Sequence, residues 1–141
     1  MVFVYLMIIH PEVQAKFQAE LDEVVGRSRL PDFSDRENLP YVSAVYKELI
    51  RWHPISPFSA AHRAIMEDEY KGMRIPIGTA MIPNIWSIIF FPLILEFNLE
   101  FRGMARDKSV YGSDAESFRP ERFVESELPD PSRIIFGFGR R

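Results

Sequence analysis

The sequence predicts a mainly α-helical fold with a small β-hairpin region. Two stretches, 11–25 and 39–52, carry apolar residues at helical spacing, and the stretch 62–82 carries short β-favouring runs separated by glycine-containing turns. The chain has 141 residues, of which 47% are hydrophobic and 26% are charged. These values fit one globular domain built around one core.

The first predicted helix covers 11–25. Pro11 suits a first helical turn, and the carboxylate of Glu12 complements the helix dipole there. The apolar residues share one helical face: Val13, Phe17, Leu21 and Val24. Gly26 then offers a C-terminal stop.

A second helix is predicted over 39–52, after a loop at 27–33 and a short helical turn in which Ser34 and Glu37 match a capping box. Pro40 lies near the first turn of this helix, and Pro54 and Pro57 end it. The stripe expected to be buried consists of Val42, Val45, Leu49 and Trp52.

Short strands are expected after the second helix. One lies around 62–64, a hairpin over 69–75 turns at Lys71-Gly72, and a further strand covers 79–82. Together they predict a small antiparallel region beside the helices.

The rest of the chain gives weaker signals. The segment 87–103 has neither a period of 2 nor one of 3.6, and 104–123 is expected to be irregular. A loop is predicted at 125–131, and a Gly-rich basic turn at 136–141.

Composition excludes several functions. The chain has no cysteine and three histidines without paired spacing, so no disulfide and no metal site made by this chain alone is expected. A net charge of −3 gives no basic surface for nucleic acid. The apolar runs 1–9 and 85–95 fall short of the about 20 residues of a spanning helix, so no membrane span is predicted.

One charged pair on the second helix has two interpretations. Glu48 and Arg51 are three residues apart, and residues at this spacing lie side by side on a helix. An exposed pair of this kind is worth only about 0.2–0.5 kcal/mol. A buried pair would instead be able to hold a third group from elsewhere in the chain.

Three features in a fixed order favour the second interpretation. They are Glu48-x-x-Arg51, the stretch 118–123 with sequence FRPERF, and Phe136-x-x-Gly139-x-Arg141. With the HPEVQ stretch at 10–14 before them, they resemble the C-terminal third of the cytochrome P-450 superfamily, the heme-thiolate monooxygenases. The style of the sequence is similar to fungal members, which implies a place in fungal secondary metabolism.

The resemblance implies an incomplete P-450 fold, with helices J and K, a small sheet and the irregular segment called the meander. The helices at 11–25 and 39–52 would be J and K. Glu48, Arg51 and Arg122 would form the family's structural triad, because one carboxylate can accept from two planar guanidinium groups. This role is structural, and no catalytic residue is expected among the 141.

The resemblance also implies heme contacts. Phe136, Gly139 and Arg141 match the start of the heme-binding loop, and Arg141 and His62 match positions that reach the heme propionates. For His62 the alternative is an exposed histidine at a strand edge. In the family the cysteine that ligates iron follows two positions after the residue matching Arg141, so no residue here is expected to bind the metal.

Two further interpretations concern the substrate and an insertion. Phe58, Ser59 and Ala60 fall where the family lines its substrate pocket, although an apolar loop after a helix is equally expected to be ordinary core. The whole chain, 1–141, would be a partial P-450 domain. Within it 87–103 departs from the pattern and is predicted to be a non-family insertion, a translated unspliced intron.

The family function implied is oxidation of a small apolar substrate, using heme, dioxygen and electrons from a reductase. The oxygen-activating helix and the membrane anchor, which holds family members at the endoplasmic reticulum, have no counterpart before Met1. The chain alone is therefore expected to be inactive and marginally stable. The alternative is a non-catalytic fragment or a small helical module that binds a partner.

Overall fold

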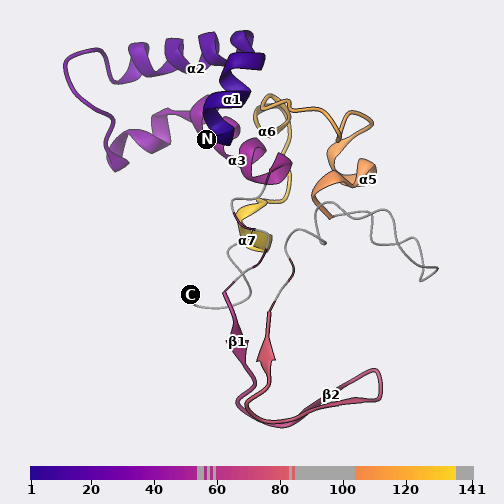
Figure 1. The fold of residues 1–141 in the computed structure, drawn as a ribbon. Coiled ribbons are helices and arrows are strands. Elements are labelled where there is room, and N and C mark those ends of the chain that lie inside the picture. The colour runs from indigo at the N-terminus through magenta and orange to yellow at the C-terminus, as the bar shows by residue number, and fades with distance from the viewer. Residues whose placement is uncertain (54–55, 57, 59, 83, 85–103, 136–141) are drawn as a thin grey trace.

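The protein is mainly α-helical, with two small antiparallel sheets among the residues that the computed structural model describes, 1–53, 56, 58, 60–82, 84 and 104–135 (Figure 1). The predicted fold class is therefore confirmed. The helices are α1 (Val2–Ile9), α2 (Pro11–Val24), α3 (Pro40–Trp52), α5 (Lys108–Tyr111), α6 (Arg122–Glu125) and α7 (Ser132–Ile135), with 3-10 helices η1 (Phe33–Asn38) and η2 (Met104–Arg106). The strands are β1 (His62–Arg63), β2 (Asp68–Tyr70), β3 (Met73–Ile75) and β4 (Ala80–Met81).

The first two helices meet at a proline-determined bend. The apolar opening, for which no helix is predicted, forms α1, and its C-cap His10 has φ −125° and ψ 69°. A proline disfavours helical angles in the residue before it, so Pro11 both ends α1 and begins α2. Gly26, at φ 76°, follows the end of α2 in the left-handed conformation that terminates helices. The predicted helix 11–25 is thus one residue longer than the observed one.

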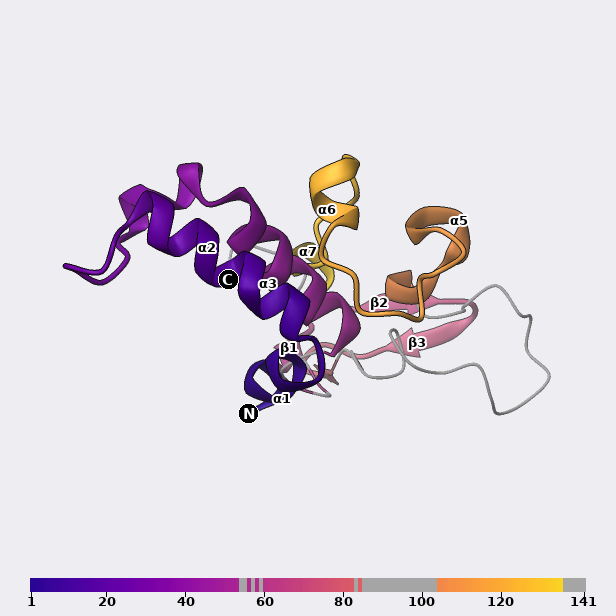
Figure 2. The same cartoon turned by 90° about the horizontal axis from the view of Figure 1, so that it is seen from above.

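Helix α3 is the centre of the arrangement. It lies between α2 on one side and the short helices α6 and α7 on the other (Figure 2). Of the predicted stripe, Val45 is buried, whereas the other three residues are half-buried. The predicted buried stripe was narrower than the observed buried surface of α3, which also includes Ala44 and Ile50. A helix covered on two sides buries more than one face.

The hydrophobic core joins the three long helices to the irregular segment after them. Leu6, Met7, Val13, Val45 and Phe118 form one buried cluster. On α2 only Val13 of the predicted apolar face is buried, and the others on that face are half-buried. On α1 much apolar surface remains exposed, so the core is small for a chain of this length.

The 3-10 helix η1 is capped differently from the prediction. The side chain of Asp32 accepts from the backbone N–H of Phe33, and Asp35 closes a capping box with Asp32. The expected box of Ser34 and Glu37 is therefore wrong by two residues. Asp35 lies within reach of Arg29, which binds it through both terminal nitrogens.

The two sheets are short hairpin pairs. Strand β1 pairs with β4, and β2 pairs with β3 in antiparallel register. Lys71 and Gly72 both have positive φ, 49° and 78°, the geometry of a two-residue type I′ turn. The β2–β3 hairpin extends away from the helices (Figure 1).

The segment 104–123 is more ordered than predicted. It contains η2 and α5 and reaches the start of α6, where only irregular structure was expected. The four-residue helix α7 was not predicted. No helix in the described part of the chain is long and apolar enough to cross a membrane. The predicted insertion at 87–103 lies outside the described residues.

Candidate functional site

A carboxylate and two guanidinium groups meet where α3 contacts α6. Glu48 and Arg51 lie one turn apart on α3, and Arg122 is the first residue of α6. Glu48 and Arg51 are 0% exposed, and Arg122 is 2% exposed. The structure therefore brings the three predicted triad residues together, and it places the Glu48–Arg51 pair in the interior rather than on a solvated surface.

The Glu48 carboxylate accepts four hydrogen bonds. Arg51 donates from Nε to Oε2 and from Nη2 to Oε1, both at 2.7 Å. Oε1 also accepts from Arg122 Nε at 3.2 Å and from the backbone N–H of Arg119 at 2.8 Å. A buried carboxylate that is bound this fully has neither solvent access nor a free oxygen for a substrate proton. Its chemistry is that of a structural anchor.

The other guanidinium N–H groups bind mainly backbone carbonyls, and Arg122 Nη1 also donates to Asp114 Oδ1 at 3.2 Å. Arg51 and Arg122 donate to carbonyl oxygens at distances from 2.5 to 3.1 Å. The acceptors are Ala105, Tyr111, Asp114, Ala115 and Ser117. Much of 105–117 lacks a helix or sheet partner, so these side chains supply donors that regular structure supplies elsewhere. The cluster fixes this segment against α3.

A second anchor, which sequence reasoning missed, joins α2 to the start of α3. Glu20 accepts from the backbone N–H groups of Tyr41 at 2.9 Å and Val42 at 2.8 Å. Leu39, in the N-cap position of α3, has no side chain that can cap the helix. That absence is the signal that would have predicted a cap from elsewhere in the chain.

Glu121, next to Arg122, links α2 and α3 to the start of α6. Its Oε1 accepts from Lys16 Nζ at 2.6 Å and from the hydroxyl of Tyr41 at 3.0 Å. Burial raises the pKa of Glu121, but the hydrogen bonds and the charge of Lys16 outweigh burial, so its pKa lies below the ordinary value. Burial and the Glu121 contact raise the pKa of Tyr41, which stays a neutral donor.

The other predicted site residues lie apart from this cluster. His62 is exposed in β1 opposite Met81. Phe58 is 54% exposed, and Ala60 is also exposed. The remaining candidates lie outside the described residues: Ser59, Phe136, Gly139 and Arg141. Among the residues that are described, no group of three or more acidic or histidine side chains is placed to hold a metal ion.

Comparison with known proteins gives consistent matches. A family model described as Cytochrome P450 matches residues 1–92. Cytochrome P450 monooxygenase 176 of Postia placenta is 42% identical over 144 aligned residues, which cover 99% of this chain and 24% of that protein. Cytochrome P450 monooxygenase ppsD of Aspergillus oryzae is 45% identical over 145 aligned residues, with the same shares covered. The chain thus spans about a quarter of the length of these relatives.

Solved structures agree with the sequence matches. A zebra fish cytochrome P450 structure with progesterone superposes with a TM-score of 0.63 at 35% identity. The match covers 88% of this chain and 25% of that one. A zebra fish cytochrome P450 structure with abiraterone matches with a TM-score of 0.61 and 34% identity.

Proposed function

Because the chain belongs to the cytochrome P450 family, we propose that its 141 residues form a C-terminal segment of a heme-dependent monooxygenase. The observation that carries the proposal is the buried Glu48 cluster. In this cluster Glu48 forms ion pairs with Arg51 on α3 and Arg122 on α6. The two arginines also donate hydrogen bonds to backbone carbonyls of 105–117. The role of the cluster is to hold the segment that leads toward 136–141, the proposed heme loop.

The residues that are expected to contact heme are part of the same proposal. Phe136 and Gly139 would shape the loop, and Arg141 and His62 would donate to the propionates, since carboxylates are best held by cationic or N–H donors. When bound, heme supplies the chemistry of dioxygen activation. These donors fit the propionates, but the 141 residues contain no cysteine. The thiolate that the family's iron requires must come from outside them, and these residues alone are expected to be inactive.

The proposed substrate is a small apolar molecule, oxidised with electrons from a reductase. Phe58, Ser59 and Ala60 would contribute one edge of its pocket. The fungal relatives are named as monooxygenases, which supports oxidation in fungal secondary metabolism. The segment 87–103 is proposed to be an insertion that takes no part in this function.

A chimera tests the proposal. This chain would replace the matching quarter of Cytochrome P450 monooxygenase ppsD, with 87–103 either present or deleted, and the remainder of that relative is expected to supply the cysteine with which the family ligates iron. We expect the deleted form, reduced under carbon monoxide, to show the Soret band of a thiolate-ligated heme. Glu48→Ala should abolish the band, and Glu23→Ala, at an exposed site on α2, should retain it.

Two results would contradict the proposal. The first is a chimera that folds but gives no thiolate-type band in either form. The second is a thiolate-type band from hemin added to the 141-residue chain alone, because no cysteine is present to produce it. Weak heme binding by that chain without such a band is the expected result.

A further inference from the structure

Two consecutive residues, Glu121 and Arg122, attach the start of α6 to two separate points on α3. Arg122 Nε donates to Glu48 Oε1 at 3.2 Å, and Glu121 Oε1 accepts from the Tyr41 hydroxyl at 3.0 Å. Tyr41 and Glu48 are seven residues apart, so they lie on the same face of α3, about 10 Å apart along its axis. The start of α6 is therefore held against one face of α3 at two places.

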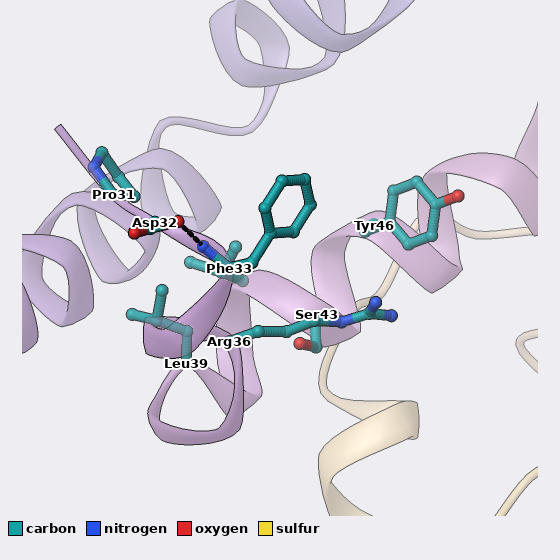
Figure 3. Close-up of a pocket in the computed structure, with 8 residues that line it drawn as sticks. Pro31, Asp32, Phe33, Arg36, Leu39, Ser43 and Tyr46 are labelled. Carbon is teal, nitrogen blue, oxygen red and sulfur yellow. Dashed lines mark hydrogen bonds between the residues drawn. The ribbon is translucent and has the colours of Figure 1, made fainter.

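Another face of the same helix turns lines an open groove. Tyr41 and Val42 differ by about 100° around the helix axis, and Val42 and Tyr46 line a groove of about 480 Å³ against η1. Figure 3 shows the Tyr46 ring and the Phe33 ring of η1 at separate edges of that groove. Glu121 thus engages the face of α3 that also carries Glu48, and not the groove face.

Lys16 of α2 completes the attachment of Glu121. Its Nζ donates to Glu121 Oε1 at 2.6 Å and lies 5.8 Å from the centre of the Tyr41 ring, where a cation is favourably placed. The hydrogen bond to Glu121 is the main reason that the pKa of Lys16 is raised, and the charges of Glu12 and Glu125 contribute less. Glu121 is therefore the principal partner of Lys16 among the carboxylates around it.

This link is suited to setting geometry more than to adding stability. The Lys16 side chain is 56% exposed and that of Glu121 is 26% exposed, and exposed ion pairs add little to the free energy of folding. A hydrogen bond is nevertheless directional, and Glu121 directly precedes Arg122 in the chain. Holding the Glu121 side chain toward α2 and Tyr41 restricts the rotation of the backbone that carries Arg122.

The contact between Arg122 and Glu48 is sensitive to that rotation. The buried guanidinium of Arg122 also donates to Asp114 and to the backbone carbonyls of Tyr111 and Ser117. A planar, rigid fork meets so many partners in one orientation only. Its bond to Glu48 is the longest of the four that this carboxylate accepts, so it is the first that a small displacement of α6 would break.

We propose that Glu121 is a positioning residue for the Glu48 cluster: held by Lys16 and Tyr41, it fixes the start of α6 so that Arg122 meets Glu48. The inference rests on the proposed function in one step, namely that the cluster holds the segment leading to the heme loop. Glu121 itself would touch neither heme nor substrate. Its removal should therefore disturb the heme loop while the protein stays folded.

Hydrogen exchange followed by NMR tests the first step without heme. The backbone N–H of Arg119 donates to Glu48 at 2.8 Å, so it reports whether the cluster is intact. In the 141-residue chain with trimethylamine N-oxide, which favours compact states, Glu121→Ala should raise the exchange rate of this N–H about tenfold relative to amides in the middle of α3. Glu121→Gln keeps an oxygen acceptor and should stay within about twofold of the native rate, as should Glu127→Ala at an exposed position after α6.

The chimera without 87–103 tests the second step through its Soret band under carbon monoxide. Glu121→Ala should lower the share of thiolate-ligated heme about twofold, and Glu121→Gln should restore the native share. Val13→Ala removes buried volume on α2, the helix that carries Lys16. This control should lower the melting temperature more than Glu121→Ala does, yet keep the native share of thiolate-ligated heme.

Three results would overturn the proposal. The first is native exchange of the Arg119 N–H in Glu121→Ala, and the second is a native share of thiolate-ligated heme in that variant. The third is an equal loss of thiolate-ligated heme in Val13→Ala, because the band would then follow stability alone. A native chimera without a thiolate-type band would instead contradict the proposed function, and exchange at Arg119 would still decide whether Glu121 positions Arg122.

Discussion

Removing the Glu48 carboxylate is expected to destabilise the fold more than any surface substitution. Glu48→Ala takes the acceptor from three guanidinium N–H groups and one backbone N–H. It also leaves Arg51 and Arg122 buried without their shared counter-charge. Breaking a buried ion pair by removing one partner costs about 3–5 kcal/mol. Glu23→Ala, at an exposed position on α2, should change stability by less than about 0.5 kcal/mol.

Urea unfolding followed by circular dichroism measures the difference. With a slope of about 2 kcal/mol per molar urea, a loss of about 4 kcal/mol lowers the midpoint by about 2 M. Since α1 leaves much apolar surface exposed, the native chain itself is expected to be marginal. Adding trimethylamine N-oxide, which favours compact states, keeps both proteins in a measurable range. A midpoint for Glu48→Ala equal to that of Glu23→Ala would refute a stabilising role for the cluster.

Three further predictions concern other parts of the chain. Glu20→Ala removes the two-bond cap of α3 and should cost about 1–2 kcal/mol, with faster hydrogen exchange at the first-turn amides of α3; unchanged exchange would exclude the cap. The hydrogen bonds from Arg29 hold the pKa of Asp35 at about 2, below its usual range. The η1 contribution to stability should therefore be complete above about pH 4 and be lost as the pH falls toward 2, a loss that circular dichroism would detect and that Asp35→Asn should lack. Deletion of 87–103 should leave the melting temperature unchanged and reduce aggregation in light scattering; a large fall in melting temperature would contradict its assignment as an insertion.

The elements bounded by proline or glycine could be predicted from the sequence. Pro11 and Pro40 set the starts of α2 and α3 to within one residue, and Lys71-Gly72 located the hairpin turn. These residues act on the backbone locally, through fixed or permitted φ angles. The mainly α fold class followed from the same signals.

Features that depend on distant contacts could not be predicted from local sequence. The Glu20 cap joins residues about twenty positions apart, and α3 is covered on a further side because η2, α6 and α7 pack against it. The capping box is formed by Asp32 and Asp35, and not by Ser34 and Glu37 as predicted, because Arg29 binds Asp35 and holds it in the turn. Glu48 and Arg51 were found from their spacing, but only the distant Arg122 distinguishes a buried cluster from a surface pair.

The hydrogen bonds of the Glu48 cluster indicate why charged residues occupy an interior position. A buried ion pair is often replaceable by apolar residues at no cost in stability, because the charges gain little beyond their desolvation penalty. Here Arg51 and Arg122 also donate to five backbone carbonyls of 105–117, most of which no helix or strand would satisfy. Apolar replacements would fill the volume but leave the three buried carbonyls, those of Ala105, Tyr111 and Ala115, without these donors, at a cost of about 1–3 kcal/mol each. The two arginines are therefore required by the irregular backbone. Glu48 orients both of them and, together with Asp114, which also pairs with Arg122, balances their charge.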